Sequence, residues 1–251
     1  MPSRRQRQMC IRDREWAWRV GNNSTTNLIN FSDKIFAIFK QEANFYKRRG
    51  GNVFWVGHPM IDLTKKLPSK KVSRTTLKLQ ANQNILLLMP ASRPQELKYI
   101  LPTFLKTAKK LQLRYPSLVV YIPSCRRVFD EKFRKGLEKY EIKGKVISQQ
   151  EDAELIPYIY SLAKLALCKS GTVNMELALY GIPQIIGYRV SRVTAFIAKR
   201  ILNFKVRFIS PVNLLVKKFI IPEFVQKNFN EEKIFYKACR LLDLKLSLIH
   251  I

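Results

Sequence analysis

Short apolar runs alternate with amphipathic segments through most of the chain. Five runs rich in Leu, Ile and Val predict buried strands, at residues 85–89, 118–122, 145–148, 165–168 and 184–188. The segments between and after them predict helices at residues 96–113, 127–140, 152–163, 172–180 and 191–202. Pro102 predicts that the first of these helices is kinked or begins late. This alternation favours an α/β fold, a Rossmann-like parallel sheet with helices on both faces.

The chain before the first of these strands has a different character. Two shorter strands are predicted at residues 35–39 and 53–56, separated by a Gly50-Gly51 break. Residues 64–76 are polar, basic and almost free of apolar side chains, which is typical of a linker. We therefore expect a small domain at residues 15–63, a linker at 64–76 and a larger Rossmann-like domain at 77–240.

Both ends of the sequence fall outside this pattern. Residues 1–14 form a basic leader without apolar periodicity, and we expect it to be disordered. The strings MCIRDR near the start and LSLIHI within the tail at 241–251 resemble translated sequencing-adapter sequence, so non-native ends are one interpretation and mobile tails the other. The leader has no apolar core of the kind a secretory signal needs, and no run approaches the roughly 18 apolar residues of a membrane span.

The charge balance narrows the choice of partners. The chain has 251 residues with 46 Lys and Arg against 18 Asp and Glu, a formal net charge of +28. Such a chain attracts anions, which leaves nucleic acid, an anionic lipid surface and phosphorylated small molecules as candidates. Hydrophobic residues make up 47% of the chain, which argues against disorder. Four cysteines without CxxC pairing and only two histidines make a metal site unexpected and favour a reducing, cytosolic compartment.

Two loops that follow predicted strands could bind an anion. In the first, Ser92 permits close approach of a ligand and Arg93 offers a guanidinium suited to phosphate. In the second, Ser170 or Thr172 could cap a helix whose free N–H groups attract an anion, and Gly171 leaves space for it. Each loop could equally be an ordinary turn between a strand and a helix.

Other candidate residues lie after these loops or before them. Glu176, one turn into the helix after the second loop, could accept hydrogen bonds from a ribose diol. Asn213, Glu223 and Gln226 are polar residues in apolar surroundings, which indicates placed hydrogen bonds or simple loop capping. His58 follows a predicted strand and fits a turn or hinge residue as well as a general base. No GxxxxGK[ST] or GxGxxG motif is present, which weighs against a nucleotide triphosphatase or a dehydrogenase.

Six ordered motifs resemble those of the lipid-A-disaccharide synthase family. They lie within the span from Trp16 to Ala238 and consist of residues 33–39, 56–59, 90–96, 169–177 and 188–190, followed by Asn213 with Pro222, Glu223 and Gln226. The resemblance implies the carboxy-terminal half of a GT-B glycosyltransferase, with residues 77–240 as the nucleotide-sugar-binding domain and 15–63 as the remnant of an acceptor domain.

The resemblance also implies a reaction, substrates and roles for the candidate residues. An inverting transferase would move 2,3-diacylglucosamine from its UDP donor to 2,3-diacylglucosamine 1-phosphate (lipid X), giving lipid A disaccharide 1-phosphate and UDP without metal or cofactor. Arg93 and the helix start at Ser170 to Thr172 would stabilise the departing UDP, Glu176 would hold the ribose, and Asn213 with Gln226 would orient donor groups. The family acts at the cytoplasmic face of the inner membrane as a peripheral enzyme, so an anionic membrane surface is an expected partner and a homo-oligomer is possible.

Two departures and two alternatives accompany this resemblance. Ala91 stands where the family usually has Gly, and most of the acceptor domain that supplies the catalytic base is absent, so we expect a fragment that is inactive alone. A basic nucleic-acid-binding module is the alternative favoured by the charge, although Lys and Arg are spread along the chain rather than clustered. A nucleotide-sugar epimerase of similar fold is the other.

Overall fold

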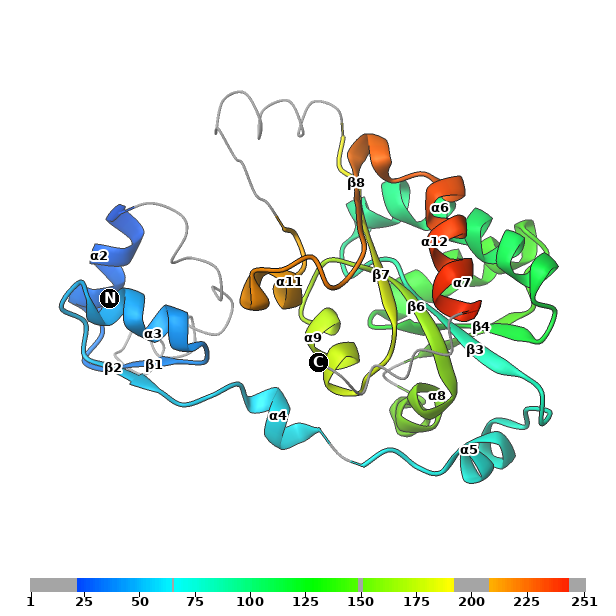
Figure 1. The fold of residues 1–251 in the computed structure, drawn as a ribbon, viewed down its shortest axis with the longest axis horizontal. Coiled ribbons are helices and arrows are strands. Elements are labelled where there is room, and N and C mark those ends of the chain that lie inside the picture. Colours follow the sequence, from blue (N-terminus) through cyan, green and yellow to red (C-terminus); the bar gives the residue numbers. More distant parts are fainter. Residues whose placement is uncertain (1–21, 65, 149–150, 192–207, 244–251) are drawn as a thin grey trace. The chain divides into compact units, whose positions relative to one another are not determined.

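The computed structural model describes residues 22–64, 66–148, 151–191 and 208–243 (Figure 1). The chain divides into two compact units, residues 1–65 and 66–251, each of which is considered by itself. The predicted helix at 191–202 lies outside the described residues apart from Ser191, and so do the leader at 1–14 and all but residues 241–243 of the tail at 241–251.

The first unit is built around a parallel β-α-β arrangement. Its elements are α2 (Asn22–Phe31), β1 (Ile35–Ala37), α3 (Lys40–Lys47), β2 (Val53–Trp55) and α4 (Pro59–Leu63). β1 and β2 pair in parallel. Because side chains alternate along a strand, Ile35 and Ala37 are buried while Phe36 is exposed. Tyr46 of α3 completes this small core.

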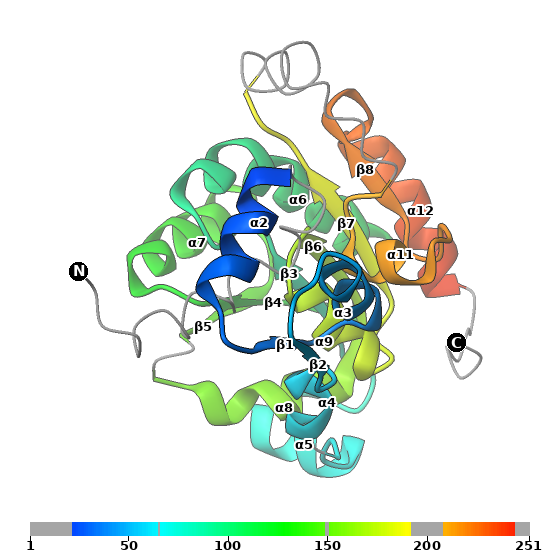
Figure 2. The ribbon, with the colours of Figure 1, turned by 90° about the vertical axis from the view of Figure 1, so that its left-hand side faces the viewer.

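The second unit contains a six-stranded parallel sheet. Its strands are β3 (Asn84–Met89), β4 (Leu118–Ser124), β5 (Gly144–Ser148), β6 (Ala163–Lys169), β7 (Gln184–Tyr188) and β8 (Glu223–Val225). They lie in the order β5-β4-β3-β6-β7-β8, which can be followed across Figure 2. Every neighbouring pair is parallel, which confirms the Rossmann-like α/β fold.

Helices cover both faces of this sheet, as the sequence pattern predicts (Figures 1 and 2). They are α5 (Lys70–Leu77), α6 (Pro94–Arg114), α7 (Arg127–Lys139), α8 (Ile156–Leu162), α9 (Val173–Leu179), α11 (Pro211–Val216) and α12 (Glu231–Asp243), with short 3₁₀ turns η3 (Ala153–Leu155) and η5 (Gln226–Asn228). Helices α6, α7 and α12 share an apolar core with Leu86, whereas α5, α8, α9 and α11 share another with its neighbour Leu87. The side chains of consecutive strand residues thus point into opposite cores, which explains why the strands are apolar throughout.

One close contact in the first of these cores requires a glycine. A Cβ atom at Gly187 in β7 would lie 2.1 Å from Cε2 of Phe229 and 2.8 Å from Cζ of Phe104. These two rings pack edge to face with centroids 5.3 Å apart. The missing side chain therefore makes room for the aromatic pair that joins α6 to the segment after β8.

Two local expectations need correction. The segment 64–76 holds most of α5, whose buried Ser73 accepts a hydrogen bond from the Ser161 hydroxyl of α8 at 2.5 Å. Its scarcity of apolar residues suggested a linker because only one face of this short helix, ending in buried Leu77, contacts the sheet unit. The late start expected for α6 is also wrong, since the helix begins at Pro94 and continues through the exposed Pro102.

Candidate functional site

The sheet reverses its direction of growth between β3 and β6. From β3 the chain continues outward to β4 and β5, and from β6 it continues the other way to β7 and β8. The two central strands end together, with Met89 opposite Cys168. Their following loops therefore meet at the carboxyl edge, the place where open α/β sheets bind ligands.

The loop after β3 is organised around a carboxylate. Oε2 of Glu96 accepts hydrogen bonds from the backbone N–H of Ser92 at 2.7 Å, from that of Arg93 at 3.0 Å and from the Ser92 hydroxyl at 3.4 Å. This is one half of a helix capping box. The Arg93 side chain is exposed at the start of α6. The predicted anion loop therefore offers its guanidinium to solvent, while its amide groups already hold an internal anion.

The loop after β6 is held from within by Asn174. The fully buried Asn174 side chain accepts a hydrogen bond from the Gly171 backbone N–H at 2.9 Å and donates to the Lys169 carbonyl at 3.1 Å. The Ser170 hydroxyl donates to the carbonyl of Ile209, and Thr172 occupies the cap position without a side-chain cap bond. The expected capping by Ser170 or Thr172 is wrong, because an asparagine three residues beyond Gly171 takes that donor.

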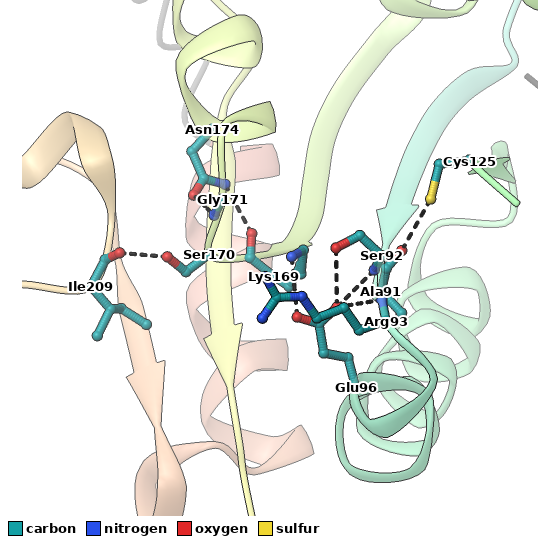
Figure 3. Close-up of polar contacts among 10 residues, drawn as sticks. All are labelled: Ala91, Ser92, Arg93, Glu96, Cys125, Lys169, Ser170, Gly171, Asn174 and Ile209. Atoms are coloured by element: carbon teal, nitrogen blue, oxygen red, sulfur yellow. Dashed lines mark hydrogen bonds and ion pairs between the residues drawn. The ribbon is translucent and has the colours of Figure 1, made fainter. Parts of the chain in front are cut away.

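An ion pair joins the two loops, and sequence reasoning did not single out either partner (Figure 3). Nζ of Lys169 lies 3.1 Å from Oε1 of Glu96, and the two side chains are 16% and 13% exposed. A Cβ atom at Gly171 would lie 3.6 Å from the same Nζ, so the ammonium group sits beside this glycine. The one available signal was a lysine directly after the apolar run at 165–168, since such a residue leaves the sheet at the edge where ligands bind.

Glu176 lies partly buried beneath this edge. Burial raises the pKa of its carboxyl group, and a hydrogen bond from Tyr160 of α8 opposes the shift. Burial is also the main cause that raises the pKa of the Tyr160 hydroxyl, followed by the nearby Glu176 charge. Glu176, the residue predicted to bind the ribose, therefore already has a hydrogen-bond partner inside the protein, Tyr160.

Asn213 and Glu223 form an internal clasp rather than an open binding surface. Oδ1 of the fully buried Asn213 accepts from the backbone N–H groups of Ile220 at 3.0 Å and Ile221 at 2.9 Å. Its Nδ2 donates to the Ile221 carbonyl and to Oε1 of Glu223, each at 2.7 Å. Both donors and the acceptor of this side chain are used inside the fold, and its predicted role in orienting a ligand stays a prediction.

The Glu223 carboxylate holds the segment that precedes α11. It accepts the backbone N–H groups of Ile209 at 2.8 Å and Ser210 at 2.9 Å. Ile209 also accepts the hydroxyl of Ser170, so the clasp is connected to the loop after β6. Glu223 is thus a positioning residue for the site's edge, and its carboxylate is engaged with backbone donors rather than presented to solvent.

Gln226 follows β8 at the carboxyl edge of the sheet. Its backbone is left-handed, with φ of 51°. The Arg189 guanidinium donates to the carbonyls of Gln226, at 3.2 Å, and Phe229. A left-handed non-glycine residue is costly, and such positions concentrate at functional sites. Its predicted contact with a ligand stays a prediction.

His58 has a local structural role in the first unit. Nδ1 accepts the backbone N–H of Met60 at 3.2 Å, which caps α4. The imidazole packs against the Phe39 ring with centroids 5.4 Å apart. Its assignment as a hinge stays a prediction.

The described part of the chain contains neither a metal-binding cluster nor a membrane-spanning helix. No group of three or more His, Cys, Asp or Glu side chains there is arranged to hold a metal ion. None of the helices in those residues has the length and apolar character needed to cross a bilayer.

The parallel sheet and the loops that follow β3 and β6 define a class, the Rossmann-like α/β proteins, and solved structures of similar fold include a glycosyltransferase and UDP-GlcNAc 2-epimerases. The chain is similar in fold to WaaG, described as a glycosyltransferase involved in lipopolysaccharide biosynthesis, with a TM-score of 0.53 at 14% identity, covering 84% of this chain and 53% of that one. It is similar, too, to a UDP-GlcNAc 2-epimerase from Neisseria meningitidis, with a TM-score of 0.53 at 16% identity over 86% and 55% of the two chains.

Sequence comparison identifies the particular family. Residues 11–247 match the lipid-A-disaccharide synthetase family, and the chain belongs to it. It is 48% identical to the lipid-A-disaccharide synthase of Prochlorococcus marinus (strain MIT 9313) and 35% identical to that of Gloeothece citriformis (strain PCC 7424). These matches cover 93% and 92% of this chain and 59% of each relative. The chain therefore spans about three-fifths of the length of these relatives.

Proposed function

We propose that this chain forms the donor-binding part of a lipid A biosynthesis transferase. The donor would be UDP-2,3-diacylglucosamine and the acceptor lipid X, and the products lipid A disaccharide 1-phosphate and UDP. Family membership over residues 11–247 carries this proposal. The loops that meet where β3 and β6 end support it, since that edge is where a nucleotide-sugar would bind.

The chemistry assigned to the described residues is electrostatic. As the bond to the anomeric carbon breaks, negative charge grows on the departing UDP. The exposed Arg93 guanidinium would form charge-assisted hydrogen bonds to the diphosphate. Glu176 would exchange its Tyr160 hydrogen bond for the ribose diol, and Gln226 would contact the sugar from the end of β8. The base that deprotonates the acceptor hydroxyl would come from the acceptor domain, of which we assign residues 15–63 as a part.

The surroundings of the reaction follow from its substrates. Both are anionic lipids, and a chain of net charge +28 is attracted to an anionic membrane surface. We therefore place the protein at the cytoplasmic face of the inner membrane as a peripheral enzyme, with a homo-oligomer as a possible assembly.

Calorimetric titration of the folded chain with UDP tests this function. Saturable binding is expected, and Arg93→Ala should weaken it by about 1.5–3 kcal/mol, the worth of a hydrogen bond to a charged group. Arg134→Ala, which removes an exposed arginine of α7, is the matched control and should leave binding unchanged. A folded protein without saturable binding at millimolar UDP contradicts the proposal.

A second measurement tests whether the catalytic base lies outside this chain. With both lipid substrates supplied, the chain alone should show no transfer, because the proposed base is outside it. Measurable turnover would show that the catalytic residues lie within these 251 residues.

A further inference from the structure

The Lys169–Glu96 pair lies where the sheet changes direction. Lys169 is the last residue of β6, and Glu96 belongs to the first turn of the helix that follows β3. The two residues are 73 positions apart in the sequence and are brought together because β3 and β6 are neighbours. In Figure 3 the Lys169 side chain lies between the β6–α9 loop and the β3–α6 loop.

The Glu96 carboxylate occupies donors of the kind that a phosphate would use. One of its oxygens accepts three hydrogen bonds from Ser92 and Arg93, and the other accepts a hydrogen bond from the Lys169 ammonium group. Two backbone N–H groups, a hydroxyl and a lysine make the same donor set that proteins present to phosphate. The protein thus holds an internal anion at the entrance of the proposed diphosphate site.

The Lys169 side chain lies beside Gly171 at this edge of the sheet. A Cβ atom at Gly171 would make ordinary van der Waals contact with it, 3.5 Å from Cε and 3.6 Å from Nζ. Its side chain is 16% exposed, so the charge is partly shielded from water yet not sealed off. An ammonium group in such surroundings interacts with an anion more strongly than a fully solvated one.

We propose that Lys169 is a ligand of the donor diphosphate, and that Glu96 holds its ammonium group in place until the nucleotide arrives. The inference rests on the proposed function and adds a second cation to Arg93. A diphosphate carries more than one negative charge, so two cations, one from the end of β6 and one from the loop after β3, neutralise it better than one. Lys169 exchanges one of its contacts, from the carboxylate to a phosphate oxygen, while Glu96 keeps its backbone donors.

UDP and uridine titrations of the full chain test this role, because uridine lacks the diphosphate. Lys169→Met should weaken UDP binding about 10- to 100-fold, the loss of one charge-assisted hydrogen bond. Uridine binding, followed by ligand-observed NMR, should change less than about twofold. Lys169→Arg should retain more UDP affinity than Lys169→Met. Lys164→Met removes an exposed lysine from the same strand and should leave UDP binding unchanged.

The Glu96→Gln background separates a direct contact from an indirect one. If Lys169 touches the diphosphate, Lys169→Met still weakens UDP binding at least about tenfold in this background. If Lys169 only neutralises Glu96, that loss disappears and the proposal is overturned. Equal losses for UDP and uridine, or an equal loss in Lys164→Met, overturn it as well. Wild-type protein that fails to bind UDP overturns the proposed function and this inference together, whereas UDP binding indifferent to Lys169 overturns the inference alone.

Discussion

Asn213 gives the sharpest test of structural against ligand-binding roles. Asn213→Ala removes four hydrogen bonds, two of them in fully buried surroundings and two partly buried. The two buried bonds leave the N–H and the carbonyl of Ile221 without this partner, at about 1–3 kcal/mol each. Water can replace the two partly buried hydrogen bonds, so their contribution to the loss of stability is small.

The expected loss in the free energy of unfolding is therefore about 2–6 kcal/mol. For a domain of this size each kcal/mol lowers Tm by roughly 2–4 °C, so Tm should fall by roughly 4–24 °C. Thermal unfolding followed by circular dichroism measures this directly. Asn82→Ala, which truncates an exposed asparagine before β3, is the matched control and should leave Tm within about 2 °C of wild type.

A ligand-binding role predicts the opposite pattern. If Asn213 contacts the donor, Asn213→Ala leaves Tm near the wild-type value and weakens UDP binding at temperatures where both proteins are folded. That result would refute the clasp formed by Asn213 and Glu223. A large fall in Tm with normal UDP affinity for the folded variant would support it.

Two further predictions concern packing and pH. Gly187→Ala should lower the free energy of unfolding by about 1–3 kcal/mol, because the new Cβ meets the Phe229 ring, and chemical denaturation should show it; an unchanged midpoint would contradict the packing. Burial raises the pKa of the Glu176 carboxyl group, so the stability from this site is complete below the ordinary carboxyl pKa and is lost as pH rises through the raised value. Glu176→Gln has no proton to lose, so its Tm should exceed that of wild type at pH 7 and the gap should narrow toward about pH 4, whereas a gap independent of pH would contradict the shift.

The architecture of the larger unit follows from the pattern of apolar residues along the chain. Apolar runs such as that in β3 are local signals, because a strand covered on both faces must be apolar at every position. The loops that follow β3 and β6 were predicted for the same reason, since parallel strands end at one edge. Two short elements are not predictable in this way. Strand β8 has three residues and helix α11 has six, too few for a periodic pattern to distinguish them from loops.

Which polar groups at that edge are free depends on contacts between segments that are distant in the sequence. Local sequence favoured a hydroxyl cap near Ser170, yet Asn174 takes the Gly171 donor. The Lys169–Glu96 ion pair could not be predicted, because its two residues are 73 positions apart and no local pattern encodes such a contact. A strand or a helix follows from near neighbours in the chain, whereas hydrogen-bond partners are chosen by groups that the fold brings together. The sequence therefore predicts the edge of the sheet at which the site lies. The packing of β3 beside β6 brings together the charged side chains found there.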